Sequence, residues 1–417
     1  MNVSKKRASG VIASVAAVAL AVGSALPAQA ADTQLKIGGI IPLTGALSFL
    51  SPPEIAGIRL AVADINKAGG VLGKKVTVSI LDSGDGDTLS IADQSATKHL
   101  ANGVDVVIGA AASGVTRSII NKITGAKVVQ ISMSNTAPDL STWADGGYYF
   151  RTAPSDLLQG KIIANQILQD GKKNVAIVYQ DTSYGVGLKD VAKTVLKAGG
   201  ATVKSFAFPE NETNFASIVD KALVAKPTAV LLISYDESKK AIPALQAKAF
   251  KGKNIYFVDG NLADYSAESF ASYIAGAKGS LPGKAMNAAF KKRMAAKYKA
   301  VTGKELTELA YGAESYDAVI LAALAAQAAG KATGPGIKSE ITNISKAGAG
   351  KTTVTSFAAG LAALKAGKKI NYDGFSGPVE FDKNGDPTGA FIGIYKYGTG
   401  GKYANNLVRV VAGNTVK

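Results

Sequence analysis

The stretch that decides the fold is "VDVVIGAAASGVT" (Val104–Thr116), in which an apolar run meets the start of a helical pattern. The apolar run predicts a buried strand, and Ile119 and Ile120 continue the pattern at helical spacing. The turn between them is rich in glycine and hydroxyl residues, a composition typical of phosphate-binding turns, but it contains no lysine. The stretch therefore predicts a strand–turn–helix unit whose turn binds something other than a nucleotide phosphate chain.

The same alternation of apolar runs and amphipathic segments extends along the chain. A helical pattern of 3- and 4-residue steps, for example, spans Ile55–Ile65. Two series of runs predict strands at Leu35–Ile41, Val76–Leu81, Val104–Ile108 and Val128–Ile131, and then at Val175–Tyr179, Thr202–Phe206, Ala229–Ile233 and Ile255–Val258. Strands that alternate with helices indicate parallel sheets, so we expect an α/β fold with two doubly wound lobes.

The remaining pattern is partly helical and partly β-rich. Two further helices are expected at Met286–Val301 and Leu309–Ala329, and a β-rich tail spans Val379–Val411. Within the tail, "FDKNGDP" (Phe381–Pro387) has Asn-Gly at its centre and predicts a hairpin turn.

The first 30 residues are typical of an export signal. Three basic residues, Lys5, Lys6 and Arg7, precede an apolar run from Val11 to Leu26 and a small-residue site that ends at Ala30. We expect residues 1–30 to be a signal peptide, because the run is shorter than the ~20 residues of a membrane anchor. The chain has no cysteine. The sequence therefore predicts an exported protein that is not lipid-anchored through cysteine.

Composition excludes several kinds of chemistry. The formal net charge of +16 is scattered as lysines without interleaved aromatics, so we expect no nucleic-acid partner. The single histidine, His99, is expected to be a surface residue or a helix-end cap. One histidine and no cysteine make catalytic triads and soft-ligand metal sites improbable. The acidic loop "DSGDGD" (Asp82–Asp87) lacks EF-hand spacing, which favours a solvated loop over a calcium site. We expect no catalytic residue, metal or cofactor.

Hydroxyl residues follow two neighbouring strands. Ser113 and Thr116 follow the first, and "SMSNTAPDL" (Ser132–Leu140) follows the next. The carboxyl ends of parallel strands meet at one edge of a sheet, where helix N-termini present free N–H groups. Such an edge can hold a carboxylate without a lysine. An alternative for Ser113 is that it is simply a helix N-cap.

Several segments resemble one known family. They are "IGGIIPLTG", "EIAGIRLAVADINKAGGVLGKKV", "VIGAAASGVT", "ISMSNTAPDLS", "YQDTSYGVGL" and "FSGPVEFDKNGDPTG", in that order along the chain. Together they resemble the leucine/isoleucine/valine-binding protein family, the type I periplasmic binding proteins that serve as substrate-binding proteins of branched-chain amino acid ABC transporters. The resemblance implies two α/β lobes joined by a three-segment hinge, with the ligand in the cleft between the lobes.

The resemblance also implies lobe boundaries. The N-terminal lobe would comprise residues 31–153 plus 283–374, and the C-terminal lobe residues 154–282 plus 375–417. The three crossings would lie near Arg151–Ser155, Gly279–Lys284 and Tyr372–Gly377.

Family ligand contacts can be carried over residue by residue. The resemblance implies Ser113 and Thr116 for the ligand α-carboxylate, Ser134 and Thr136 on the following loop, and Tyr184 and Tyr235 from the second lobe. An alternative for Tyr184 is packing within its own lobe.

One position departs from the family pattern. The carboxylate that pairs with the ligand ammonium aligns with Asn261, which carries no charge. Either another acid replaces it, with Asp236, Asp259 and Asp264 as candidates, or the ligand has no amine. In "GALSFLSPPEIAG", Leu50 stands where an apolar pocket wall would be.

These observations predict an extracytoplasmic solute-binding receptor of an ABC importer. It would capture an amino acid or similar small carboxylate by hinge closure and deliver it, as a monomer, to a membrane permease. Two alternatives stay open: a sensor domain that signals to a membrane partner, and an enzyme that uses Asp236 or Tyr184 for acid–base work. Amides, aromatic acids and short carboxylic acids remain possible ligands.

Overall fold

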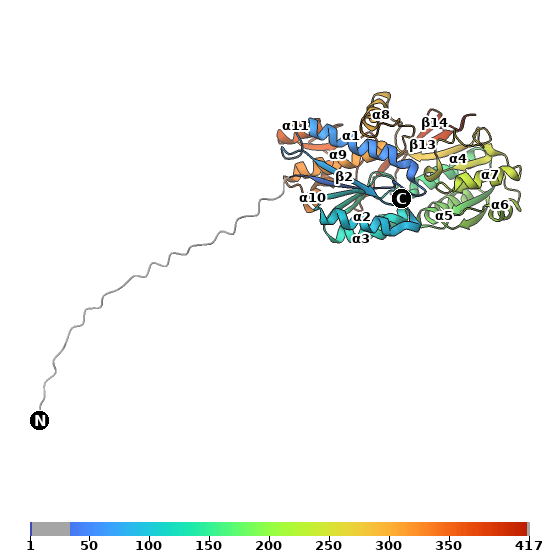
Figure 1. The fold of residues 1–417 in the computed structure, drawn as a ribbon, viewed down its shortest axis with the longest axis horizontal. Coiled ribbons are helices and arrows are strands. Elements are labelled where there is room, and N and C mark those ends of the chain that lie inside the picture. Colours follow the sequence, from blue (N-terminus) through green and yellow to red (C-terminus); the bar gives the residue numbers. More distant parts are fainter. Residues whose placement is uncertain (2–33, 415–417) are drawn as a thin grey trace. The chain divides into compact units, whose positions relative to one another are not determined.

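Two separate sheets organise the part of the chain that the computed structural model describes, which is Met1 and residues 34–414 (Figure 1). The predicted signal peptide falls on residues 2–33 and lies outside the described residues. Residues 34–414 contain no helix long and apolar enough to cross a membrane.

The first sheet has five parallel strands in the order β2-β1-β3-β4-β5. Its strands are β1 (Lys36–Ile41), β2 (Thr77–Asp82), β3 (Val106–Gly109), β4 (Val129–Ser132) and β5 (Tyr149–Arg151). Helices α1 (Ser51–Lys67), α2 (Leu89–Ala101) and α3 (Ser113–Gly125) connect the first four strands. This is a doubly wound order, which brings the loops after β1, β3 and β4 to one edge of the sheet.

The second sheet has seven strands in the order β14-β13-β10-β9-β8-β6-β7. Its parallel strands are β6 (Asn174–Gln180), β7 (Thr202–Phe208), β8 (Ala229–Ile233), β9 (Ile255–Phe257) and β10 (Lys278–Pro282). A hairpin of β13 (Gly389–Lys396) and β14 (Leu407–Asn414) adds antiparallel pairs. Its helices are α4 (Asp156–Gln169), α5 (Ser183–Ala198), α6 (Ala216–Leu223) and α7 (Ser238–Ala247). All eight predicted strands are confirmed, with no end shifted by more than two residues.

The last third of the chain returns to the first sheet before the hairpin. It forms α8 (Ala288–Thr302), α9 (Gly312–Ala329), α10 (Gly334–Ser345), α11 (Phe357–Lys365) and the short parallel pair β11 (Lys351–Val354) and β12 (Lys369–Tyr372). Helix α9 is apolar on all sides and almost entirely buried, as expected for a core helix. It packs closely on α1, where a Cβ at Gly57 would overlap the carbonyl oxygen of Gly312.

The chain passes between the two sheets three times. It leaves the first sheet after β5, returns after β10, and leaves again after β12. The first and third passages are joined by a buried ion pair, in which Arg151 Nε lies 2.6 Å from Asp386 Oδ1. Asp317 on α9 fixes the third passage, because it accepts hydrogen bonds from Tyr372 Oη (2.6 Å) and the Ser376 backbone N–H (2.7 Å).

The expectation for His99 was wrong. Its side chain is fully buried rather than exposed, and its Nε2 lies 3.0 Å from the Gly39 carbonyl oxygen. Gly38 makes the room, since a Cβ there would lie 2.8 Å from the imidazole ring. Burial lowers the pKa of His99, which keeps the ring neutral. His99 is therefore a core residue that braces α2 against β1.

Candidate functional site

A narrow cavity lies at the carboxyl ends of strands from both sheets. It encloses only about 10 Å³, and its lining consists of Leu47, Leu50, Ala111, Ser113, Ser134, Thr136, Tyr184, Tyr235, Asp259, Gly260 and Tyr311. All but Tyr311 lie two to nine residues after the end of β1, β3, β4, β6, β8 or β9. We call this space the cleft cavity.

One wall of the cleft cavity is the N-terminus of α3. The N-cap residue is Ala112, which has no side chain to cap the helix, so the alternative role of Ser113 as N-cap does not hold. Instead, Ser113 Oγ accepts hydrogen bonds from the backbone N–H groups of Thr136 and Ala137, both at 3.3 Å. These bonds tie the loops after β3 and β4 together. The first-turn N–H groups of α3 have no side-chain cap, and they give this wall a positive potential.

The lining of the cleft cavity also contains an acid, Asp259. Its side chain is buried, and its two oxygens accept hydrogen bonds from three elements. Oδ1 accepts from Tyr184 Oη (2.7 Å) and Gln159 Nε2 (2.9 Å), and Oδ2 accepts from Tyr311 Oη (2.6 Å). Burial raises the pKa of Asp259, although these hydrogen bonds oppose the effect. Asp259 is thus a rigidly held acid in the cavity wall.

A second buried acid, Asp156, lies close behind the lining. Its Oδ2 accepts a hydrogen bond from Thr136 Oγ1 (2.9 Å), and its Oδ1 is buried without a partner. Burial and the nearby Asp259 raise the pKa of Asp156 well above its usual value. Neither acid forms an ion pair with any residue of the 34–414 range. Two buried acids without a paired cation make this end of the cavity favourable for a positively charged group.

Two tyrosines complete the wall from the second sheet. The rings of Tyr184 and Tyr235 stack with centroids 5.2 Å apart. Tyr184 Oη also accepts a hydrogen bond from the Gly260 backbone N–H at 3.2 Å. A Cβ at Gly260 would lie 2.8 Å from that hydroxyl, so glycine is needed here. Both roles considered for Tyr184 therefore coexist: it packs within its own half and lines the cavity.

A third acid lies behind the loop after β4. Glu54 on α1 accepts a hydrogen bond from Ser134 Oγ (2.9 Å) through Oε1, while Oε2 is buried without a partner. Burial raises the pKa of Glu54 to about 8. This side chain is therefore mostly protonated and neutral at pH 7.

Two of the expected contact residues lie outside the lining because they serve the framework. Thr116 Oγ1 donates to the Ala110 carbonyl (3.1 Å) and accepts from Asn135 Nδ2 (2.9 Å), one helical turn below the cavity. Asn261 donates to the Leu232 carbonyl (2.8 Å) through Nδ2. Its Oδ1 accepts from the Val258 N–H (2.9 Å). Asn261 therefore braces the turn that presents Asp259 to the cavity.

Two of the candidate acids lie near the surface instead. Asp236 forms an ion pair with Lys239 (2.7 Å), and 45% of its side chain is exposed. Asp264 accepts from the Ser266 N–H at 2.9 Å and lies 3.7 Å from Lys402 Nζ. Of the three candidate acids, the structure brings only Asp259 to the cleft cavity, together with Ser113, Ser134, Thr136, Tyr184, Tyr235 and Leu50.

The lining also contains residues that sequence reasoning missed. Tyr311 enters from the segment before α9, where its backbone has a positive φ of 61°. Nothing in the local pattern marks it, because its partner Asp259 is 52 positions away in the sequence. Asp156 could have been predicted from the sequence. It is an acid in the first turn of a helix that directly follows a predicted crossing, and such a position lies near the cleft.

Comparison with known proteins identifies the family. The family model described as periplasmic binding protein matches residues 34–393. The chain belongs to the periplasmic binding protein family. Members of this family are substrate-binding proteins, and the two sheets here form the type I periplasmic binding protein fold.

The similar proteins align with different shares of this periplasmic binding protein. The Leu/Ile/Val-binding protein BraC3 of Rhizobium johnstonii is 32% identical over 216 residues, which is 51% of this chain and 58% of that protein. The match thus spans little more than half the length of that relative. The chemotactic signal transduction system substrate-binding protein BasB of Halobacterium salinarum is 27% identical over 371 residues, 87% of each chain. A leucine-binding protein LivK from Thermotoga maritima superposes with a TM-score of 0.73 at 22% identity, over 90% of this chain and 98% of that one.

Proposed function

We propose that this protein captures a free α-amino acid in the cleft cavity. The observation that carries the proposal is that the lining of one cavity contains both a helix N-terminus without a side-chain cap and a buried acid, Asp259, that forms no ion pair with a described residue. The α-carboxylate would accept hydrogen bonds from the first turn of α3 and from the hydroxyls of Ser113 and Thr136. The ammonium would bind Asp259, and its charge would favour the ionised form of Asp156 behind it, whose pKa burial otherwise raises. Asp259 takes the role that alignment gave to Asn261.

The side chain of the ligand would be aliphatic. The lining residues Leu47, Leu50 and Ala111 are apolar, and none of them offers a hydrogen bond from its side chain. Relatives such as BraC3 are named as Leu/Ile/Val-binding proteins. Leucine, isoleucine and valine are therefore the first candidates.

Capture would proceed by opening and then closure of two lobes, residues 31–153 plus 283–374 and residues 154–282 plus 375–417, because the cleft cavity as seen here is too small for an amino acid. The ligand would touch Ser113 on one lobe and Tyr184 on the other, and only a ligand that contacts both can stabilise the closed form. The closed protein would then deliver its ligand, as an exported monomer, to an ABC permease.

A second role has one specific observation in its favour. BasB, which matches over 87% of this chain, is named as a component of a chemotactic signal transduction system. The same ligand capture could report occupancy to a membrane receptor rather than supply a permease.

The proposal is tested by identifying the ligand directly. Mass spectrometry of small molecules released from purified protein, followed by calorimetry with L-leucine, L-isoleucine and L-valine, should find at least one of them bound with micromolar or tighter affinity. We expect leucinol, which lacks the carboxylate, to bind at least about 10-fold more weakly than leucine, since one charge-assisted bond contributes about 1.5–3 kcal/mol. Equal binding of leucinol and leucine would refute the assignment of the α3 terminus.

A further inference from the structure

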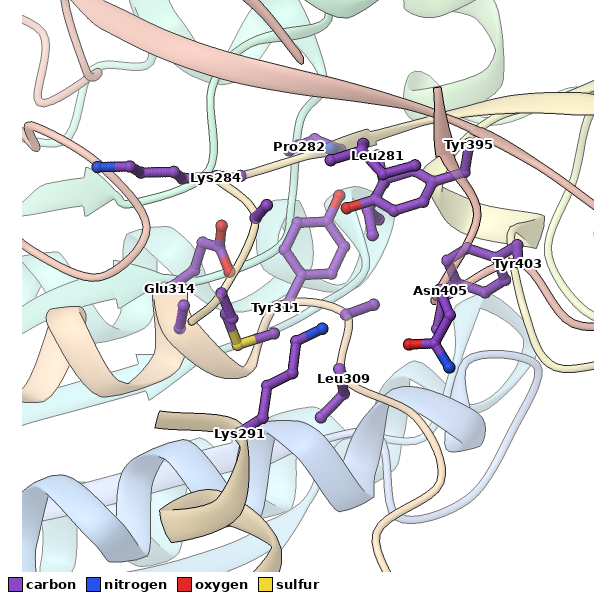
Figure 2. A pocket seen from close by; sticks show the side chains of 17 residues that line it. Leu281, Pro282, Lys284, Lys291, Leu309, Tyr311, Glu314, Tyr395, Tyr403 and Asn405 are labelled. Atoms are coloured by element: carbon purple, nitrogen blue, oxygen red, sulfur yellow. The ribbon is translucent and has the colours of Figure 1, made fainter. Parts of the chain in front are cut away.

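A second cavity, larger than the cleft cavity, also has Tyr311 in its lining. It has a volume of about 230 Å³ and is drawn in Figure 2. Its walls are the passage after β10 (281–286), Lys291 on α8, the segment before α9 (309–314), and Tyr395, Tyr403 and residues 404–407 of the β13–β14 hairpin. We call it the α8 cavity. Because α8 packs on α1 beside the first sheet while the hairpin belongs to the second sheet, its walls come from both halves of the fold.

Three polar groups from three elements line the α8 cavity without a partner on another residue. Figure 2 shows the ammonium of Lys291 and the hydroxyl of Tyr395 pointing toward the Tyr311 ring, with the carboxyl of Glu314 beside that ring. In the described part of the chain, no ion pair or hydrogen bond to another residue involves any of these three groups. Glu314 is only 3% exposed. Lys291 and Tyr395 are half-buried. A buried polar group such as Glu314 normally has a partner, so a ligand would satisfy a carboxyl that the protein pairs only with its own backbone.

The charge in the α8 cavity favours an anion. Burial raises the pKa of Glu314 to about 8, so the carboxyl is mostly neutral at pH 7 and can donate a hydrogen bond. The cationic Lys291 is then the only charged side chain that Figure 2 shows pointing inward, because Lys284 points away from the space. The remaining walls are apolar and include Leu281, Leu309 and the ring of Tyr311. The cavity thus combines one cation, two neutral donors and an apolar surface.

We propose that the α8 cavity is a second binding site, for a small monocarboxylate with an apolar body. Its carboxylate would lie between Lys291 Nζ and Tyr395 Oη, and its body would pack on Leu281, Leu309 and the Tyr311 ring. The occupant would touch α8 and the β13–β14 hairpin at once, and so would stabilise the arrangement of the three passages seen here. Tyr311 is shared, since its ring lines the α8 cavity and its hydroxyl binds Asp259 in the cleft cavity.

The test uses benzoate as probe, with benzyl alcohol as its uncharged counterpart. Calorimetry or ligand-observed NMR would compare the wild type with Lys291→Gln and Tyr395→Phe. Lys292→Gln is the matched control, because Lys292 is the exposed neighbour on the same helix. We expect Lys291→Gln to weaken benzoate binding at least 10-fold and Tyr395→Phe about 3-fold or more, while Lys292→Gln stays within 2-fold of wild type. Benzyl alcohol should bind at least 10-fold more weakly than benzoate.

Ser113→Ala distinguishes the two cavities. Ser113→Ala should bind benzoate as tightly as the wild type does but should bind leucine more weakly. Lys291→Gln should weaken leucine binding far less than Ser113→Ala does. A Ser113→Ala variant that loses benzoate affinity as strongly as Lys291→Gln would place the probe in the cleft cavity and overturn the proposal. Equal binding by Lys291→Gln and Lys292→Gln, or no benzoate binding to the wild type at millimolar concentration, would overturn it as well. None of the outcomes that would overturn the proposal depends on whether leucine is the ligand of the cleft cavity.

Discussion

Replacing Glu54 by glutamine should change how stability depends on pH. In the folded protein burial raises the pKa of Glu54 from 4.5 to about 8, so the folded state holds this proton more tightly than the unfolded chain does. The stabilisation from the protonated carboxyl is fully present below pH 4.5 and is lost as the pH rises through 8. Each pH unit in that window costs about 1.4 kcal/mol. Between pH 6 and pH 8 the wild type should therefore lose roughly 2–3 kcal/mol of unfolding free energy through this residue.

The glutamine variant isolates that loss because it keeps the shape and the hydrogen bond from Ser134 Oγ but does not titrate. Urea unfolding of both proteins at pH 6, 7 and 8 gives the difference in unfolding free energy at each pH. That difference should shift in favour of Glu54→Gln by roughly 2–3 kcal/mol from pH 6 to pH 8. The control, Glu305→Gln, changes an exposed glutamate and should run parallel to wild type. A difference for Glu54→Gln that stays constant over this range would refute the burial argument.

Three further substitutions test the framework of the site. Tyr311→Phe removes a donor to Asp259 and should weaken amino-acid binding about 5- to 30-fold in calorimetry without lowering the melting temperature by more than a few degrees; an unchanged affinity would show that this hydroxyl does not orient the acid. Ser113→Ala should weaken leucine about 10- to 100-fold, and equal affinities would remove that hydroxyl from the site. Gly57→Ala should lower the melting temperature sharply, because its Cβ would overlap a carbonyl of α9, while Gly125→Ala, which faces open space, should not; similar melting temperatures for both would contradict the packing described.

The fold could be predicted from the sequence because the central strands of its sheets, such as β3, β4 and β8, are buried on both faces. Apolar runs such as Val104–Ile108 stand out between amphipathic helices, and the alternation fixes parallel sheets. The three-residue β5 (Tyr149–Arg151) was missed, because so short a strand has no period of its own. The prediction for His99 was wrong because one glycine on β1, Gly38, opens the space that its ring fills, and a periodicity argument does not detect that space.

The candidate site was predictable where it depends on strand ends. Ser113 and Tyr184 line the cavity because each directly follows a parallel strand, and that rule needs only the sequence. The acid was harder to assign. In a short 3-10 turn (Asp259–Asn261), the first side chain lines the cavity and the last one hydrogen-bonds to the framework. The sequence alignment placed the ligand-binding acid at Asn261, two residues after Asp259, and alignment alone does not detect a shift of two residues. Tyr311 arrives from a passage remote in sequence, so only the folded chain reveals it.

The central claim, that Asp259 recognises the ligand ammonium, has one direct measurement. Calorimetry should compare L-leucine with 4-methylpentanoate, which has the same carbon skeleton and carboxylate but no amine, on wild type and on Asp259→Asn. We expect the wild type to prefer leucine by at least about 100-fold, corresponding to about 2.7 kcal/mol or more for a buried charge pair. In Asp259→Asn the preference should fall to within about 10-fold, mainly through loss of leucine affinity. A preference for leucine that is the same in both proteins, or a wild type that binds both compounds equally, would contradict the claim.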